Sequence, residues 1–435
     1  MKRLVLCCDG TWSHAVNPQV SNIVKLARSM PIGTTRGADG EDVVQLVQYV
    51  GGVGAHGYLL DRLFGGAFGY GLTRNVMDGY RFLAMAYEPG DEIVVLGYSR
   101  GAYTARSIVG MLSQVGLLEP DAVDAGLLCE AERVYRLQPP SPRRLARAAR
   151  VARTARPGSW RHRRAERVLA RVREVAQEKT TFHDEHGRTV PVDLLGVFDT
   201  VGALGVPGPS RRKSRFHDVS LSPIVRRARQ ALAIDERRIT FAPCLWSVPE
   251  DDPPGRVAQV WFPGTHGDVG GGGARCGLSD LALQWMADEL RDAGVAIDPH
   301  RLSRQLSPRA PLVLEQAPPW PFRALNAVKR LMPRYGIVDG RLVFRQGLRV
   351  LALPSPTGAW RDGVRLADTV LRYVLRDAYG TLAPNLGWWM AEAGGVERVP
   401  VEPIAAARAD LRPLVAGDRE VSAPERSPRA LTAGR

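Results

Sequence analysis

The stretch VVLGYSRGAYTAR, residues 94–106, holds one serine between two glycines in the pattern G-x-S-x-G. An apolar run ends at Gly97, and a helix-forming run begins after Ser99. A tight strand-to-helix turn of this kind points the serine hydroxyl away from the sheet, and the glycines avoid Cβ clashes with neighbouring backbone. The backbone N–H of Arg100 then lies at a helix N-terminus, where it stabilises an oxyanion. The pattern predicts Ser99 as the nucleophile of acyl transfer; a plain tight turn is the alternative.

A serine nucleophile needs a general base, and His266 is the histidine that we expect to supply it. The chain has eight histidines. His266 stands in VWFPGTHGDVGGGG, residues 260–273, directly after a strand-like run. So many glycines indicate a loop whose backbone bends sharply or packs closely. A purely structural histidine is the alternative.

The third partner should be a carboxylate at the end of another strand, and Asp199 occupies such a place in LLGVFDTVGALG, residues 194–205. The chain order is then Ser99, Asp199, His266, which is the order of α/β hydrolases. Asp268 is the competing candidate, but its side chain would have to fold back to reach an imidazole two residues away. Either aspartate has the alternative role of capping a loop.

The first strand-like run ends in CCDGTW, residues 7–12, and this loop has two interpretations. In the first, Gly10 and Thr11 supply the second oxyanion donor and Asp9 shapes the loop. In the second, Asp-Gly-Thr resembles the nucleophile loop of haloacid-dehalogenase phosphatases. That family needs another aspartate two residues before Asp9, where this chain has Cys7, so we favour the first interpretation.

Metal and cofactor chemistry is only weakly indicated. Asp9, Asp199 and Asp268 together would offer oxygen ligands, but carboxylates scattered so widely are a poor signal of a metal site. The five cysteines are an odd number, are scattered and contain no C-x-x-C pair, so neither a disulfide framework nor a zinc site is indicated. We therefore expect a hydrolase without metal or cofactor.

The elements that would position these residues alternate between strand-like and helix-like patterns. EIVVLG, residues 92–97, is continuously apolar, as expected of a strand buried on both faces. Such alternation predicts an α/β-hydrolase-like fold, with a mostly parallel central sheet and helices on both faces. Strands are expected at 3–8, 43–50, 92–97, 192–198, 238–243 and 257–262, and helices at 21–30, at 72–87, from about 100, and at 278–294 with Ser279 as N-cap.

Changes of pattern along the chain suggest three parts. Residues 1–295 form the catalytic domain, interrupted at about 119–185 by a helical, basic insertion. Residues 296–400 form a helical and irregular region packed on that domain. Residues 401–435 are rich in proline, alanine and charge, which predicts a disordered tail.

The charge of +14 and the sequence pI of about 10.0 predict attraction to an anionic partner. Twelve arginines lie in residues 143–173. This segment and residues 320–334 are basic and amphipathic, as expected of helices on anionic lipid headgroups, and we expect them to form a lid that docks on membranes. A solvated surface insertion is the alternative. Nucleic acid is a poorer fit, because Trp160 is the only Phe, Tyr or Trp within 143–173.

The sequence shows no apolar run near the roughly 20 residues of a membrane-spanning helix. The N-terminal apolar run is too short for a signal peptide and meets Asp9 at once. We therefore expect a cytoplasmic protein, with export by a signal-free route or peripheral membrane association as further possibilities.

Five blocks in order resemble the Tle1-like type VI secretion phospholipase effectors, formerly a domain of unknown function with an α/β-hydrolase fold. The resemblance spans roughly residues 2–290 and implies a Ser-Asp-His lipase-type hydrolase, with Ser99 as nucleophile, Asp199 as acid and His266 as base. The blocks are LVLCCDGTW, GDEIVVLGYSRGAYTAR, LLGVFDTVGALG, ARQALAIDERRITFAPCLW and VWFPGTHGDVGGG with LSDLALQWM.

Two departures from this family pattern concern the substrate pocket. The second strand runs into YVGGVGAHG, where a proline or an acid often follows the tyrosine, and Asp368 stands where a histidine is expected. The expected activity is hydrolysis of carboxylic esters, above all phospholipid acyl esters. The alternatives are an esterase for small soluble esters and a catalytically silent scaffold that binds an anionic surface or nucleic acid.

Overall fold

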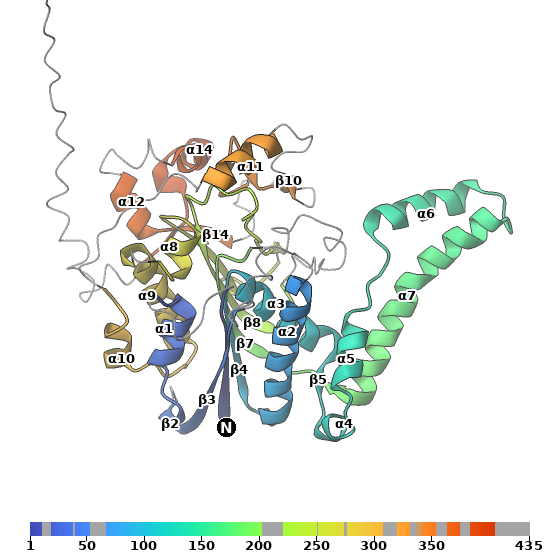
Figure 1. The fold of residues 1–435 in the computed structure, drawn as a ribbon, viewed down its shortest axis with the longest axis horizontal. Coiled ribbons are helices and arrows are strands. Elements are labelled where there is room, and N and C mark those ends of the chain that lie inside the picture. The colour runs from blue at the N-terminus through green and yellow to red at the C-terminus, as the bar shows by residue number, and fades with distance from the viewer. Residues whose placement is uncertain are drawn as a thin grey trace, which may run out of the picture.

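The structure is a computed structural model of the 435-residue chain. Its core is a nine-stranded sheet in the order β15-β14-β9-β8-β7-β4-β1-β3-β2 (Figure 1). All neighbouring strands run parallel except β2, which is antiparallel to β3. The structure describes residues 1–10, 19–37, 40–52, 67–201, 221–249, 251–273, 276–307, 320–330, 337–338, 341–353, 363–374 and 383–404.

The strands follow the apolar and β-branched runs of the sequence. Five of the six expected strands are present, with bounds within one residue of the prediction. The strands of the sheet are β1 (Lys2–Cys8), β2 (Gly33–Arg36), β3 (Asp42–Val50), β4 (Glu92–Tyr98), β7 (Val192–Phe198), β8 (Val225–Ala233), β9 (Val257–Phe262), β14 (Val364–Ala367) and β15 (Val401–Glu402).

Helices cover both faces of the sheet, which confirms the α/β prediction. α1 (Asn22–Ser29) and α9 (Gly277–Asp292) bury their apolar side chains against one face. α2 (Ala67–Ala86) and α3 (Arg100–Val115) bury theirs against the other. Each face therefore has its own hydrophobic core, and β1 and β4, which contribute to both cores, are buried almost throughout.

Two local predictions were wrong. The strand expected at 238–243 lies earlier, at β8, and residues 238–243 form turns that pass beside the carboxyl end of the sheet. The N-cap of α9 is Cys276 rather than Ser279, whose hydroxyl lies inside the first turn and donates to the Cys276 carbonyl oxygen.

The helical insertion between β4 and β7 is closed by a short antiparallel pair, β5 (Leu117–Leu118) with β6 (Gly187–Arg188). α6 and the first half of α7 form a hairpin that extends away from the sheet, while the second half of α7 packs near α3 and α5 (Figure 1). The role of this insertion as a lid stays a prediction. Its helices are α4 (Pro120–Asp124), α5 (Leu128–Tyr135), α6 (Pro142–Thr154) and α7 (Trp160–His186).

The C-terminal region contributes directly to the sheet, because β14 and β15 extend it beyond β9. β15 begins at Val401, the first residue of the expected tail, and residues from 405 onward lie outside the described part. No helix in the described ranges is both long and apolar enough to cross a membrane. The other elements here are α8 (His266–Gly270), α10 (Pro299–Ser303), α11 (Trp320–Arg330), β10 (Ile337–Val338), β11 (Arg341–Leu342), β12 (Phe344–Arg345), β13 (Leu348–Arg349), α12 (Asp368–Val374), α14 (Pro384–Ala393) and the 3₁₀ turn η5 (Val396–Arg398).

Candidate active site

Ser99 lies at the sharp turn between β4 and α3, in a strained conformation. Its φ is +56°, a region that non-glycine residues rarely occupy. A Cβ on Gly97 would lie 2.5 Å from the Cα of Ala102, and one on Gly101 would lie 2.2 Å from the carbonyl oxygen of Cys8. Glycine is therefore required on both sides of the serine. Ser99 is the N-cap of α3, yet its hydroxyl caps no backbone N–H.

Asp199 follows the neighbouring strand in an equally unusual conformation. β4 and β7 pair with Tyr98 opposite Phe198, so Ser99 and Asp199 each lie one residue beyond paired strand ends. The Asp199 amide donates to the carbonyl oxygen of Ala231 at 2.7 Å, although its φ is +38°. Ser99 and Asp199 thus both have a positive φ at neighbouring strand ends. Backbone strain of this kind occurs mainly at functional sites.

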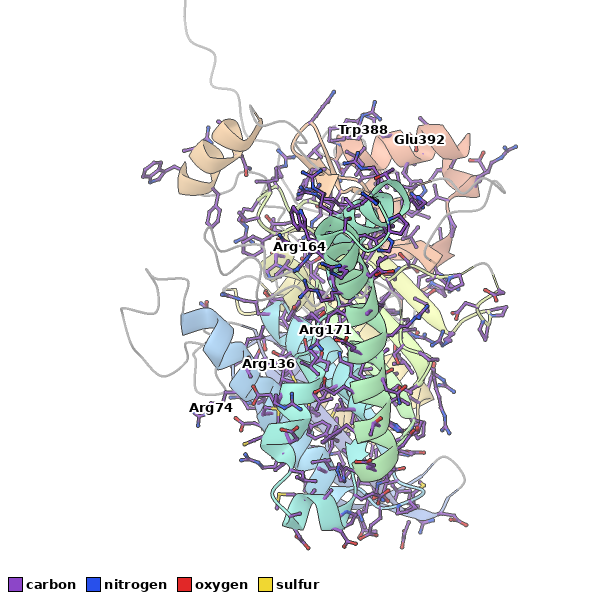
Figure 2. The ribbon with its side chains drawn as sticks, turned by 90° about the vertical axis from the view of Figure 1, so that its right-hand side faces the viewer. Arg74, Arg136, Arg164, Arg171, Trp388 and Glu392 are labelled. Carbon is purple, nitrogen blue, oxygen red and sulfur yellow. The ribbon has the colours of Figure 1, made fainter. Side chains whose placement is uncertain are left out.

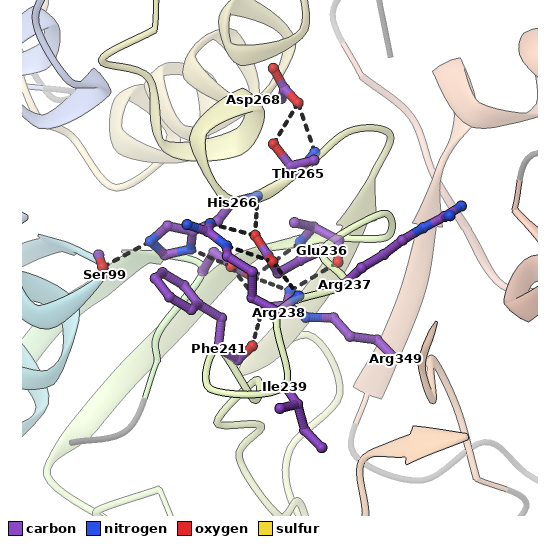
Figure 3. A network of polar contacts seen from close by, with 12 residues as sticks. Ser99, Glu236, Arg237, Arg238, Ile239, Phe241, Thr265, His266, Asp268 and Arg349 are labelled. Carbon is purple, nitrogen blue, oxygen red and sulfur yellow. Dashed lines mark hydrogen bonds and ion pairs between the residues drawn. The ribbon is translucent and has the colours of Figure 1, made fainter. Parts of the chain in front are cut away.

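His266 joins these two side chains. It follows β9 at the start of α8, and its Nε2 lies 2.8 Å from Ser99 Oγ while its Nδ1 lies 2.6 Å from Asp199 Oδ2 (Figure 3). The exposed fractions of Ser99, His266 and Asp199 are 7%, 5% and 0%. The imidazole is held between aromatic rings, with Tyr98 and Phe241 each at a centroid distance of 5.0 Å. The three residues predicted from the sequence thus form one continuous hydrogen-bonded chain.

Asp268 lies near these three residues, but it caps the N-terminus of α8. Its Oδ2 accepts hydrogen bonds from the backbone N–H of Thr265 at 2.8 Å and from the Thr265 hydroxyl at 2.7 Å (Figure 3). The Thr265 side chain in turn accepts from the backbone N–H of Asp268, so the two residues form a capping box. The alternative role as a cap therefore applies to Asp268. The arrangement favours Asp199 as the partner of His266.

Asp9 organises the end of β1. Its Oδ1 accepts from the Ser21 hydroxyl at 2.7 Å and from the Gly10 amide at 2.6 Å, and its Oδ2 accepts from the Tyr49 hydroxyl at 2.7 Å. These contacts agree with a loop-shaping role. The Gly10 amide is engaged within its own loop, and Thr11 lies outside the described residues. The amide of Arg100, the other predicted oxyanion donor, lies at the N-terminal end of α3.

No metal-binding cluster of three or more His, Cys, Asp or Glu side chains occurs in the described ranges. Burial raises the pKa of the Cys7 thiol to about 12, with a further contribution from the charge of Asp9. A thiol that keeps its proton at neutral pH is a poor nucleophile and a poor metal ligand.

Arg349 is a site residue that the sequence did not reveal. It lies at the end of β13, is fully buried, and donates hydrogen bonds to both carboxylate oxygens of Asp199. Burial by itself would raise the pKa of Asp199, but the charge of Arg349 and then the hydrogen bond from His266 hold that pKa well below its usual range. Asp199 is therefore ionised at neutral pH. No pattern around Arg349 distinguishes it from the chain's other arginines.

The loop after β8 also packs against His266. Glu236 Oε2 accepts from the His266 amide at 3.3 Å and is paired with Arg238 at 2.6 Å. Arg238 in turn lies over the ring of Phe241, and Phe322 of α11 contacts both side chains. The first turn of α11 thus lies beside the site, whereas the other basic segment, 143–173, belongs to the extended hairpin.

Comparisons with known proteins find similarity to two uncharacterized proteins. The chain is 26% identical over 254 residues to the uncharacterized protein YEL023C of Saccharomyces cerevisiae, covering 55% of this chain and 32% of the yeast protein. It is also similar to a crystal structure of an uncharacterized protein from Pseudomonas aeruginosa, with a TM-score of 0.35 and 18% identity over 68% of this chain and 46% of that one. The chain thus spans about a third of the yeast relative and about half of that bacterial structure.

The model of one protein family covers most of the chain. Its description is type VI secretion system, phospholipase effector Tle1-like, catalytic domain, and it matches residues 2–289. These residues include β1, β4, β7 and β9 with the three side chains at their carboxyl ends. At family level this supports hydrolysis of lipid esters. The chain belongs to the Tle1-like phospholipase effector family, of which it carries the catalytic domain.

Proposed function

We propose that this protein is a serine hydrolase that cleaves the acyl esters of phospholipids. The observation that carries the proposal is the continuous chain from Ser99 Oγ through the imidazole of His266 to the carboxylate of Asp199, with donor–acceptor distances of 2.8 and 2.6 Å. This is the geometry in which a neutral imidazole accepts the hydroxyl proton while a buried carboxylate fixes its tautomer. Membership of a phospholipase family supports a lipid ester as the substrate.

Acylation begins when Ser99 Oγ attacks the ester carbonyl carbon and its proton passes to His266 Nε2. A C–O bond forms at Ser99, and the carbonyl oxygen becomes an oxyanion near the amide of Arg100. Collapse of this intermediate breaks the ester C–O bond, and His266 returns its proton to the leaving alcohol. Asp199 stabilises the imidazolium that exists between these two transfers.

Deacylation repeats the sequence with water as the nucleophile. His266 takes a proton from water, the hydroxide adds to the acyl carbon, and the bond to Ser99 Oγ breaks as the proton returns to it. The products are a fatty acid and regenerated Ser99. A donor at the oxyanion position contributes about 2.7–4 kcal/mol to lowering the barrier, and the N-terminal end of α3 supports this role for the Arg100 amide.

A fluorophosphonate probe tests this assignment directly. We expect one equivalent to react at Ser99, with loss of fluoride and formation of an Oγ–P bond, because an acyl-transfer serine attacks phosphorus as it attacks a carbonyl. Mass spectrometry should find the adduct on the peptide that contains Ser99, and fatty-acid release from phosphatidylglycerol vesicles should fall in parallel. Labelling at another serine with full loss of activity would contradict the mechanism.

We also propose that the enzyme docks on an anionic membrane. The hairpin of α6 and α7 supports this proposal. A groove of about 590 Å³ lies between these helices, and its α7 residues recur every three or four positions and so share one helix face (Figure 2). In the described ranges, no carboxylate pairs with Arg144, Arg164 or Arg167. The groove is lined by Pro140, Arg144, Trp160, Arg163, Arg164, Arg167, Val168 and Arg171.

Exposed tryptophans accompany this unpaired charge. Trp160 at the groove is 62% exposed, and Trp320 at the start of α11 is 76% exposed. Tryptophan favours the boundary between headgroups and acyl chains, and arginine favours the phosphates above it. α11 lies beside the candidate site, so these two contacts would bring the site to the lipid surface.

Vesicle binding should depend on these arginines. Each arginine near an anionic surface contributes about 1 kcal/mol, so changing Arg144, Arg164 and Arg167 together to Gln should weaken binding to phosphatidylglycerol vesicles by about 10²-fold. Co-sedimentation at low and high salt measures this, because screening weakens the same contacts.

A matched variant changes Arg74, Arg226 and Arg301 to Gln. It alters the net charge equally, but these arginines are paired with Asp78, Asp193 and Asp298, so binding should change little. Equal losses in the two triple variants, or a DNA gel shift that depends on the groove arginines while vesicle binding does not, would overturn membrane docking.

A further inference from the structure

Arg349 reaches the candidate site from outside the region that the family model matches. Its Nη1 donates to Asp199 Oδ1 at 2.6 Å and its Nη2 donates to Asp199 Oδ2 at 3.0 Å. A fork that engages both oxygens fixes the plane of the carboxylate as well as its charge, which a single donor does not do. Both side chains are fully buried, so water does not screen the pair.

The guanidinium of Arg349 is itself fixed by backbone. Nη1 also donates to the carbonyl oxygen of Ala233 at 2.9 Å, and Nη2 donates to that of Phe241 at 2.6 Å. Ala233 is the last residue of β8, and Phe241 packs edge-on against the imidazole of His266. The side chain of Arg349 therefore connects the carboxylate of Asp199 both to the end of β8 and to the following loop, whose Phe241 contacts His266 (Figure 3).

The plane of the Asp199 carboxylate matters for His266. The Nδ1 of His266 lies 2.6 Å from Asp199 Oδ2, and Arg349 is the side chain that holds both oxygens of that carboxylate. A carboxylate turned out of this plane would hold the imidazole less well in the orientation that presents Nε2 to Ser99.

We infer that Arg349 is a positioning residue of the catalytic machinery, which orients Asp199 and, through it, the imidazole of His266. The inference rests on the proposed function. It makes the C-terminal region part of the active site, although the family model ends at residue 289. The residue acts through Asp199 and, being fully buried behind it, has no contact with the substrate.

Steady-state hydrolysis of p-nitrophenyl butyrate from pH 5.5 to 9 tests this role. Arg349→Met keeps the bulk of the side chain but removes its charge and fork. We expect kcat to fall by about 10²-fold with little change in KM, because the carboxylate loses its fixed plane.

Arg349→Lys separates charge from orientation. Its ammonium keeps the positive charge beside Asp199 but holds the carboxylate less rigidly than the fork does, so kcat should fall only about tenfold. Arg3→Met is the matched control, since Arg3 is also buried and paired with a carboxylate, Glu92 at 2.6 Å, at the opposite end of the sheet. Its kcat should stay near that of the wild type.

The outcomes decide between the two proposals. A folded Arg349→Met with the kcat of the wild type would overturn the positioning role. If Arg349→Met does not fold, Arg349→Lys decides, and a wild-type kcat in that variant contradicts the role. Failure of the wild type to label at Ser99 would instead overturn the proposed function, whatever the Arg349 variants do.

Discussion

Ser99→Ala is expected to abolish ester hydrolysis while leaving the fold intact. Loss of the nucleophile of a Ser-His-Asp site lowers kcat by about 10⁴- to 10⁶-fold, and the residual rate comes from binding and oxyanion stabilisation. The hydroxyl of Ser99 makes no cap bond to α3, so its removal costs that helix nothing. Alanine does have to adopt the same positive φ, so a small loss of stability is expected. Fatty-acid release from phosphatidylglycerol vesicles and p-nitrophenyl butyrate turnover both measure the effect.

Ser107→Ala is the matched control for this variant. Ser107 is also buried and lies on α3, but its hydroxyl donates to the carbonyl oxygen of Tyr103 at 2.8 Å. It should keep wild-type turnover. Vesicle binding by Ser99→Ala should also be unchanged, since the hairpin is untouched. Turnover by Ser99→Ala within tenfold of the wild type would rule out Ser99 as the nucleophile.

The parallel part of the sheet could be predicted because its central strands are continuous apolar runs in the sequence. β1, β4, β7 and β9 are buried on both faces, and burial of both faces leaves no room for polar alternation. Strand ends also located the candidate site, since carboxyl ends of parallel strands meet at one edge. Ser99, Asp199 and His266 were found from that rule together with the glycine pattern.

β8 was missed because its sequence favours a helix. Residues 225–233 read VRRARQALA, and alanine, arginine, glutamine and leucine are all good helix formers. The segment is a strand because β7 and β9 pair with it on both sides, so tertiary context overrides propensity. Two of its arginines pair with carboxylates, Arg226 with Asp193 and Arg229 with Glu289. Local sequence carries no sign of either partner strand.

Arg349 could not be predicted for a related reason. It is 150 residues from Asp199, and its role exists only after β13 has been brought beside the end of β8. A buried arginine is recognisable from sequence only when its acidic partner lies nearby on the same element. Side chains that act through long-range ion pairs therefore need coordinates, even where strand-end residues do not.

Asp199→Asn should remove both activity and stability, for two different reasons. The amide offers no second carboxylate oxygen to His266, so the imidazole loses the tautomer that presents Nε2 to Ser99, and kcat should fall by about 10⁴-fold. The variant also leaves the buried charge of Arg349 uncompensated, which costs about 3–5 kcal/mol of unfolding free energy. Urea unfolding at pH 7 captures the whole loss. The pKa of folded Asp199 lies below its unfolded value, so the stabilisation is complete above that value, about 3.9, and is lost only as pH falls toward the folded one.

Combining Asp199→Asn with Arg349→Met separates these two effects. Removing both partners eliminates the stranded charge, so the double variant should recover most of the lost unfolding free energy, whereas its kcat should stay as low as that of Asp199→Asn. Asp280→Asn provides the comparison, because Asp280 is equally buried but its carboxylate pairs with Lys25 at 2.6 Å and accepts from the Ser307 amide. It should lose stability and keep turnover. A double variant no more stable than Asp199→Asn would mean that Asp199 and Arg349 are not energetically coupled, and the ion pair would then have no part in holding the carboxylate against His266.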